Sequence, residues 1–203
     1  MKRKALLLGT LLGLAAPVAL AGAVSYDFTD FWNIDTPNTV PDHVTASAFS
    51  GWSSCFTDTF SPWNYVCGTY GPAALGFTVQ AEAGWQLDAL TFAFDGYTLG
   101  DPADSHWAVY TSLDNFTTAL GAGQFGYDTA GIQHFSMVVG ASGLTGPLEL
   151  RIVGDDGGHY EGWFVDGLRL DLDVKAVPEP ASLALVAAAL LAGSATLRHR
   201  HIL

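Results

Sequence analysis

The sequence predicts an all-β protein, a two-sheet sandwich of the jelly-roll kind, flanked by an N-terminal signal peptide and a C-terminal single transmembrane helix. In the middle of the 203-residue chain, short runs of β-branched and aromatic residues alternate with clusters of Gly, Pro, Asp and Asn. No stretch there has the periodicity of an amphipathic helix. The two ends differ from the middle, because each combines a long apolar run with basic residues.

The first 23 residues have the organisation of a signal peptide. A positive segment, Lys2-Arg3-Lys4, precedes an apolar run over residues 5–20. Two small-x-small sequences, at residues 19–21 and 21–23, fit the cleavage site, so the sequence leaves the position of the cut open between them. We therefore expect an exported chain.

The expected sandwich domain covers residues 24–175, which suffice for one sizeable core. Strand-forming runs lie at residues 75–79, 85–94, 106–110, 132–139, 148–153 and 162–174, and weaker runs at 44–49 and 117–125. In the last strong run apolar and polar residues alternate, as Leu168, Leu170 and Leu172 show. About eight strands separated by turns are typical of a two-sheet sandwich.

The chain contains two cysteines, Cys55 and Cys67. Because they lie close together in an exported sequence, we expect them to form one disulfide. A disulfide that closes so small a loop stabilises a domain by about 3 kcal/mol. No further Cys pair or nearby His completes the four ligands of a zinc site.

Aromatic and polar residues gather in the loop between the two cysteines. Trp63, Asn64 and Tyr65 lie within it, and Trp52 precedes it. Exposed aromatic rings beside polar side chains are typical of surfaces that stack on sugar rings. These residues therefore predict a glycan-stacking surface, with burial of Trp63 in the core as the open alternative.

Asp166 lies on the apolar phase of the last run, between Phe164 and Leu168. A carboxylate turned inward needs a partner, because burying an unpaired charge is costly. Calcium prefers several oxygen ligands, and Asp27 and Asp30 would supply two of them if the first strand pairs with the last. A hydrogen bond at a strand end is the alternative, and no other cofactor is expected.

The charge of the middle part limits its partners. Between Val24 and Val177 there are three basic and 19 acidic residues, a formal charge of −16. This balance excludes nucleic acid, whose phosphates require clustered Lys and Arg. It suits a soluble extracellular surface and favours divalent cations.

No catalytic set is recognisable in the sequence. It contains no nucleophile elbow and no His-x-x-x-His zinc pattern, and nothing marks a glycosidase carboxylate pair. We therefore do not expect an enzyme.

The last residues, 176–203, form a second targeting segment. Val177-Pro178-Glu179-Pro180 precedes an apolar run over residues 181–197, and Arg198-His199-Arg200-His201 follows it. An apolar run of this length is at the lower limit for a membrane helix, about 17–25 residues, and basic clusters stay on the cytoplasmic side. The prolines keep the motif out of the helix. A sorting signal and a plain membrane anchor are both compatible with this order.

The motif, apolar helix and basic end together resemble the PEP-CTERM sorting signal of Gram-negative bacteria. The resemblance implies processing by an exosortase, a membrane transpeptidase-like enzyme, in species that make exopolysaccharide. It also implies a precursor anchored in the inner membrane through the C-terminal helix. After processing, the protein would belong to the cell surface or the extracellular matrix of a biofilm.

Residues 111–172 also resemble the sandwich domains of such proteins. Ser112, Asp114 and Phe116 fit an S-x-D-x-F turn, and residues 163–170 fit their final hairpin. Similar endings occur in galactose-binding-like and carbohydrate-binding sandwiches, whose last strand carries an Asp that helps to hold a structural calcium. Many of those relatives have an acidic residue or Asn where this chain has Gly167.

We therefore expect a non-catalytic, structural or adhesive protein of the cell envelope or biofilm matrix, with weak binding to exopolysaccharide. The alternative is a secreted polysaccharide hydrolase. Two carboxylates about 5–10 Å apart in a cleft would favour the hydrolase.

Overall fold

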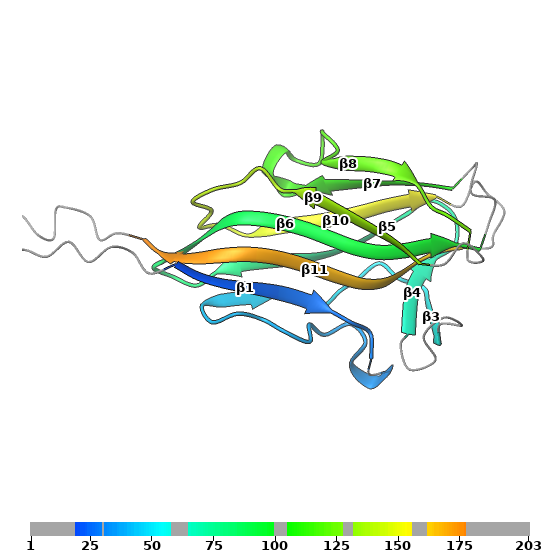
Figure 1. Cartoon of the computed structure of the whole chain (residues 1–203), viewed down its shortest axis with the longest axis horizontal. Coiled ribbons are helices and arrows are strands. Elements are labelled where there is room, and N and C mark those ends of the chain that lie inside the picture. Colours follow the sequence, from blue (N-terminus) through cyan, green and yellow to red (C-terminus); the bar gives the residue numbers. More distant parts are fainter. Residues whose placement is uncertain are drawn as a thin grey trace, which may run out of the picture.

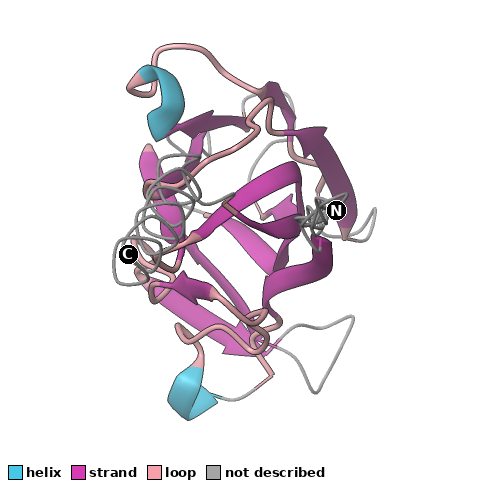
Figure 2. Ribbon diagram, turned by 90° about the vertical axis from the view of Figure 1, so that its left-hand side faces the viewer, coloured by secondary structure: helices cyan, strands magenta, loops and turns pink. Residues whose placement is uncertain are grey.

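The computed structural model describes residues 19–29, 31–57, 65–99, 105–127, 132–155 and 162–177 of the chain. These residues form eleven strands and two short 3-10 helices, arranged as two facing antiparallel sheets (Figures 1 and 2). The prediction of an all-β, two-sheet sandwich is confirmed.

One sheet has six strands and the other has five. The six-stranded sheet has the order β3 (Ser54–Thr57), β4 (Tyr65–Thr69), β11 (Trp163–Ala176), β6 (Trp85–Thr98) and β9 (Gln133–Val138), with β1 (Ala19–Tyr26) paired to β11. The five-stranded sheet has the order β2 (Val44–Ala46), β5 (Ala73–Ala81), β10 (Leu148–Asp155), β7 (His106–Thr111) and β8 (Gly121–Gln124). The chain crosses repeatedly from one sheet to the other, which gives a jelly-roll-like architecture. The 3-10 helices are η1 (Phe31–Asn33) and η2 (Ser112–Asp114).

Each of the eight predicted runs overlaps a strand, and three strands were not predicted. β6 and β11 each extend over 14 residues, further than the runs that predicted them. The unpredicted strands are β1, β3 and β4. β1 falls mostly inside the predicted signal peptide, and its pairing with β11 begins at Ala19, opposite Lys175.

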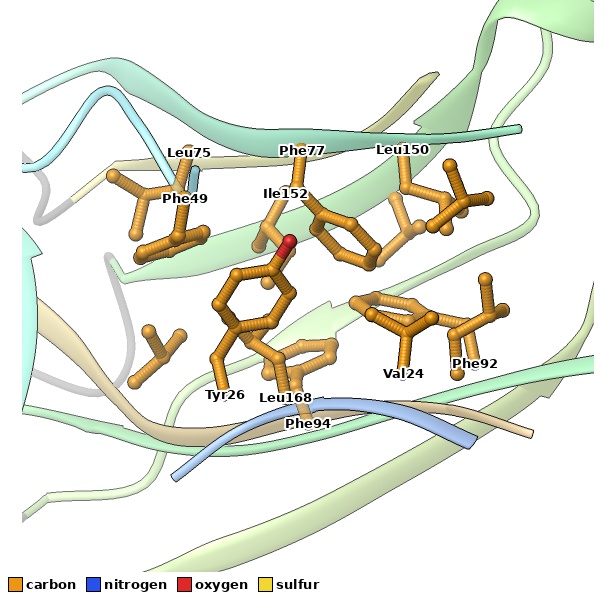
Figure 3. Packing of buried hydrophobic residues seen from close by; sticks show 14 of the residues in the cluster. Val24, Tyr26, Phe49, Leu75, Phe77, Phe92, Phe94, Leu150, Ile152 and Leu168 are labelled. Carbon is orange, nitrogen blue, oxygen red and sulfur yellow. The ribbon is translucent and has the colours of Figure 1, made fainter. Parts of the chain in front are cut away.

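The core lies between the two sheets and is rich in aromatic side chains (Figure 3). Tyr26 and Phe94 reach from the six-stranded sheet toward Phe77 and Ile152 of the five-stranded sheet (Figure 3). Tyr26 and Phe77 have ring centroids 5.0 Å apart, and the Tyr26 hydroxyl donates to the carbonyl of Ser47. Burial raises the pKa of this hydroxyl.

A β-bulge interrupts the alternation of β11. Its pairing with β6 shifts between Val165 and Gly167, so Asp166 is the extra residue. Val165 and Leu168 both belong to the core, whereas Asp166 is half-buried and lies outside the core cluster. The prediction that Asp166 lies on the inward, apolar phase of the strand is therefore wrong, because it assumed uninterrupted alternation.

The predicted disulfide is confirmed. Cys55 in β3 and Cys67 in β4 are directly paired across the two strands and bonded through their sulfur atoms. The bond ties this hairpin to the sandwich, because Cys67 is fully buried in the core.

The two ends of the described chain lie at the same end of the sandwich. β1 begins and β11 ends side by side at the left of Figure 1. The other segments predicted to carry targeting information, residues 1–18 and 178–203, lie outside the described residues. Within the part of the chain that is described, no helix is long and apolar enough to cross a membrane.

Candidate functional site

An open hollow of about 670 Å³ lies over β8, β7 and β10, on the outer face of the five-stranded sheet. Its floor is one row of small apolar side chains, because Ala108 is paired with Ala122 on one side and Val153 on the other. Val153 is 38% exposed although it is apolar. We call this hollow the outer groove.

Polar side chains form one rim of the outer groove. In the row next to the floor, His106 is paired with Gln124 on one side and Asp155 on the other. The Nε2 atoms of His106 and Gln124 are 3.5 Å apart. An amide, an imidazole and a carboxylate thus offer donors and acceptors along an apolar strip.

The floor continues in the other direction to a half-exposed aromatic residue. Tyr110 lies two residues from Ala108 on the same face and is paired with Arg151. The guanidinium of Arg151 lies 3.7 Å from the ring centroid of Phe116, and its Nε donates to Oε1 of Glu149 at 2.6 Å. The guanidinium of Arg151 therefore packs on the ring of Phe116, and the carboxylate of Glu149 balances its charge.

The predicted S-x-D-x-F turn positions Phe116 against Arg151. The carboxylate of Asp114 accepts from the backbone N–H groups of Thr117, at 3.2 Å, and Thr118, at 2.8 Å. Phe116 donates its own N–H to the carbonyl of Thr111, which brings the chain back beside β7. Hydrogen bonds from Thr118 and Thr117 lower the pKa of Asp114.

A second, smaller hollow of about 280 Å³ lies on the outer face of the six-stranded sheet. It is lined by three carboxylates, from Asp27, Asp95 and Asp166. We call it the aspartate hollow. Gly167 also lines the hollow and is paired with Asp95, and a Cβ built on Gly167 would contact only the carbonyl oxygen of Tyr26, at 3.8 Å.

Most charged groups of the aspartate hollow have hydrogen-bond partners. Asp95 Oδ1 lies 2.6 Å from Nδ1 of His134. Asp27 Oδ1 accepts from the backbone N–H and the hydroxyl of Thr29. Arg169 donates to Asp171, and this hydrogen bond together with the charge of Asp171 raises the pKa of Arg169. The hollow is polar, but much of its hydrogen-bonding capacity is used within the protein.

The structure brings together two of the three residues predicted to bind calcium. β1 pairs with β11, as the prediction required, and both Asp27 and Asp166 line the aspartate hollow. Asp30 lies outside the described residues. Among the residues that are described, no group of three or more His, Cys, Asp or Glu side chains is arranged to hold a metal ion.

The predicted glycan-stacking residues are only partly described. Trp63 and Asn64, and the side chain of Tyr65, lie outside the described part of the structure. Trp52 is half-buried and packs against the core. Among the side chains that the structure describes, the most exposed aromatic one is Trp32 in η1, at 87%, which the sequence did not single out.

The predicted sorting motif begins where the sandwich ends. β11 ends at Ala176, which is paired with Trp85, and Val177 donates its N–H to the carbonyl of Gly84 at 2.8 Å. Pro178, Glu179 and Pro180 lie outside the described residues.

The sequence did not predict the outer groove, although it predicted the strands that form it. His106, Gln124 and Asp155 are far apart in the sequence, and each by itself has the appearance of a surface residue. The only signal was the small size of the outward positions on two strands, Ala108 and Ala122. Small outward residues indicate a hollow only when the order of the strands is known.

Comparison with known proteins assigns the chain to no family. No family model matches the sequence, and no curated protein sequence matches it. Among solved structures, the chain is similar to a family 35 carbohydrate-binding module from Clostridium thermocellum, with 15% identity and a TM-score of 0.41 over 74% of this chain and 98% of that one. It is also similar to the C-terminal CBM6 of LamC from Zobellia galactanivorans, with 10% identity and a TM-score of 0.41 over 73% of this chain and 98% of that one. A Stig cyclase from Fischerella sp. TAU has 18% identity and a TM-score of 0.39, over 74% of this chain and 84% of that one.

Proposed function

We propose that the protein is an exported, non-catalytic polysaccharide-binding component of the cell envelope or biofilm matrix. The observation that supports this proposal is the outer groove, with its apolar floor and polar rim. A sugar ring has an apolar C–H face and a perimeter of hydroxyls. The floor around Ala108 and Val153 would receive the face, and His106, Gln124 and Asp155 would bond the hydroxyls.

The charge around the outer groove favours an uncharged glycan. Arg151 is its only cationic side chain among the described residues that border it, and Glu149 already pairs with it. The other charged group at the rim, Asp155, is acidic. A uronic acid would therefore gain little from Arg151, whose charge Glu149 already balances, whereas a neutral polysaccharide would lose no ion pair on binding.

The two ends of the chain support export and sorting. The leader-like first residues and the Pro-Glu-Pro tail suit a precursor that is exported, held in the inner membrane by residues 181–197 and then processed by an exosortase. Val177, the first residue of the motif, still bonds to the sandwich through Gly84 and is the last residue that the structure describes before the tail. The folded domain would thus lie next to the processing enzyme, with the distal end of the sandwich directed away from the membrane.

Affinity electrophoresis of the exported chain tests the binding site. Gels would contain a neutral β-glucan or an acidic alginate. Ala108→Arg places a long charged side chain on the groove floor, and Ala93→Arg makes the same change on the outer face of β6. Both alanines are half-buried on the outer face of a sheet. We expect neutral glucan to retard the wild type and Ala93→Arg, and Ala108→Arg to bind at least about tenfold more weakly.

If none of these polysaccharides retards the wild type, the proposed function is wrong. If Ala108→Arg binds as well as the wild type, the outer groove is the wrong site. Trp63→Ala in the same assay tests the loop between the cysteines, which remains a proposed second contact. Loss of binding in this variant alone would place the site there.

A polysaccharide hydrolase is the second candidate function. It is favoured by the three carboxylates of the aspartate hollow, since a glycosidase uses two carboxylates across the scissile bond. Against it, Asp95 and Asp27 are already engaged by His134 and Thr29. Release of reducing sugar by the wild type, lost in Asp95→Asn and Asp166→Asn, would support the hydrolase.

A structural calcium at Asp27, Asp30 and Asp166 also remains a proposal. Calcium would bring together β1 and the bulge of β11, and it would relieve repulsion between acidic groups. Melting curves with 5 mM calcium or with EDTA would test it. An identical melting temperature in both conditions would exclude a structural role for calcium.

A further inference from the structure

Strand β1 runs across both predicted leader-cleavage sites. We propose that the leader is cut between Ala21 and Gly22, so that Gly22 is the N-terminus of the mature protein. This inference rests on the proposed export, and it names the processing site that export requires. Burial and packing change abruptly within β1, and this change distinguishes the two cleavage sites.

Burial rises along β1 at the proposed cut. Ala19, Leu20 and Ala21 are exposed, Gly22 and Ala23 are half-buried, and Val24 is fully buried. A cut after Ala21 removes only the three exposed residues of the strand. Their loss shortens the pairing with β11 and leaves the core unchanged, because the apolar contacts of β1 begin at Val24.

Gly22 and Ala23 hold the neighbouring segment in place. A Cβ built on Gly22 would lie 2.6 Å from Cγ of Pro41, so Pro41 packs directly against the glycine backbone. The carbonyl of Ala23 accepts a hydrogen bond from the hydroxyl of Thr39 at 3.1 Å. Through these contacts the segment at residues 39–41 covers the outer edge of β1. A cut after Ala23 would remove both contacts, and the segment would then be held to β1 only through the hydrogen bonds of Ser25 with Asn38 and Thr39.

A cut after Ala23 would also place a charge on a residue that belongs to the core. The new α-ammonium group would belong to Val24, which is 0% exposed and paired with Leu170. Charged groups are costly to remove from water. A cut after Ala21 instead places the ammonium group on half-buried Gly22, at the border of an open hollow of about 360 Å³.

The surroundings of Gly22 favour a positive charge. Gly22 is opposite Leu172, so the flanking Asp171 and Asp173 lie one position to either side on β11. Both line the same hollow, together with Arg169, whose guanidinium is already bonded to Asp171. Two carboxylates against one paired cation leave a local negative charge, which an N-terminal ammonium group would offset.

Leader peptidases act before folding, so the fold does not direct the cut. The cleavage site between Ala21 and Gly22 is the one of the two that leaves the folded domain complete. N-terminal sequencing and intact-mass measurement of the full chain, exported in a Gram-negative host, provide the test. We expect Gly22 at the N-terminus. An exported chain that begins at Val24 would overturn this inference and leave the proposed export intact. A chain that keeps Met1 would overturn both.

A pair of variants tests the structural reason. Ala19→Asp destroys the first small-x-small sequence and leaves the second, so the cut should move to follow Ala23. Ala23→Leu destroys only the second, so Gly22 should remain the N-terminus. We expect the shortened product of Ala19→Asp to melt at least about 4 °C below the wild type. An equal melting temperature for the two mature forms would contradict the claim that Gly22 and Ala23 belong to the fold.

Discussion

The side chain of Asp88 connects strand β6 with strand β11 and with the segment around Gly143. It is 8% exposed, and its carboxylate accepts from the backbone N–H of Gly143 at 2.6 Å and from Gln86 at 3.3 Å. It also lies 3.1 Å from Nζ of Lys175. A carboxylate is suited to this position because it accepts several hydrogen bonds and matches the lysine charge.

Substitution of Asp88 by Asn should destabilise the protein by about 2 kcal/mol at neutral pH, because an amide offers one acceptor oxygen and leaves Lys175 without its ion pair. Chemical unfolding followed by circular dichroism measures this difference. Asp173→Asn is a suitable control, since it removes a neighbouring charge and none of these hydrogen bonds. Equal losses in the two variants would contradict the role given to Asp88.

The same carboxyl makes the stability depend on pH. The hydrogen bond from Gly143 is the main cause that lowers the pKa of Asp88 below its usual 3.8, with Lys175 and Gln86 adding to it. A lowered native pKa gives stability that is complete above the unfolded pKa and is lost as the pH falls through the native pKa. The wild type should therefore exceed Asp88→Asn by a constant margin above about pH 5, and this margin should shrink below about pH 4. A margin that is as large at pH 2 as at neutral pH would refute this explanation.

Glycines permit close contact between tryptophan rings and the strands. A Cβ built on Gly154 in β10 would lie 2.4 Å from the ring of Trp163, which also stacks on Phe125 with centroids 5.5 Å apart. Gly140, by contrast, has no atom within 4 Å of such a Cβ. The two positions form a matched pair for substitution.

Gly154→Ala should destabilise the protein by about 2 kcal/mol, because the methyl group forces a fully buried ring to move. Gly140→Ala should change the stability by less than about 0.5 kcal/mol. Thermal melts of both variants provide the measurement. A neutral Gly154→Ala would show that Trp163 has room that the structure does not indicate.

At the scale of single residues, the sequence predicted the disulfide pair and the proximity of Asp27 to Asp166, but not the face of the strand on which Asp166 lies. Cys55 and Cys67 needed only the rule that close cysteines in an exported chain pair with each other. The orientation of Asp166 depends on a β-bulge in the pairing of β11 with β6. The residues next to Asp166 in the sequence do not indicate where such a bulge occurs. The residues of the outer groove were missed for the same reason, because cross-strand rows connect residues far apart in the sequence.

At the scale of elements, the β3–β4 hairpin depends on its disulfide more than on strand length. β3 has four residues and β4 has five, and only Trp163, Phe164 and Val165 of β11 pair with the hairpin. Pairs of such short strands are marginal without additional constraints. The bond between Cys55 and Cys67 supplies this constraint.

The double variant Cys55→Ser/Cys67→Ser should lose about 3 kcal/mol of stability, because the unfolded chain regains the entropy of the open loop. Thermal melts with and without a reducing agent measure the effect. The wild type should lose a similar amount on reduction, and the double variant should not respond to the reductant. A wild type that melts at the same temperature after complete reduction would contradict this account.

Long strands were easier to predict than short ones. β10 and β11 show alternating apolar and polar residues, which predict strands directly. β8 has the sequence Gly121-Ala-Gly-Gln, in which the inward positions are glycines beside the ring of Trp107, so it offers little pattern. β1 was not predicted for another reason: its first residues are small and apolar, and they also fit the end of a signal peptide.

At the scale of the whole molecule, the arrangement would separate the proposed membrane attachment from the proposed binding site. β1 starts and β11 ends at one end of the sandwich, so a leader and a membrane tail would leave from the same place (Figure 1). The outer groove lies on the outer face of the five-stranded sheet, so the proposed attachment at that end would leave it open. The acidic surface keeps such a module soluble. We infer that the sandwich presents a neutral-glycan site sideways from the cell envelope.

Hydrogen–deuterium exchange of the protein with and without neutral glucan measures whether the outer groove is occupied by polysaccharide, as we propose. We predict slower exchange at the ends of β7, β8 and β10 around His106, Gln124 and Asp155, with no change around Asp95 and His134. Protection confined to the aspartate hollow, or exchange unaffected by any polysaccharide, would contradict the claim.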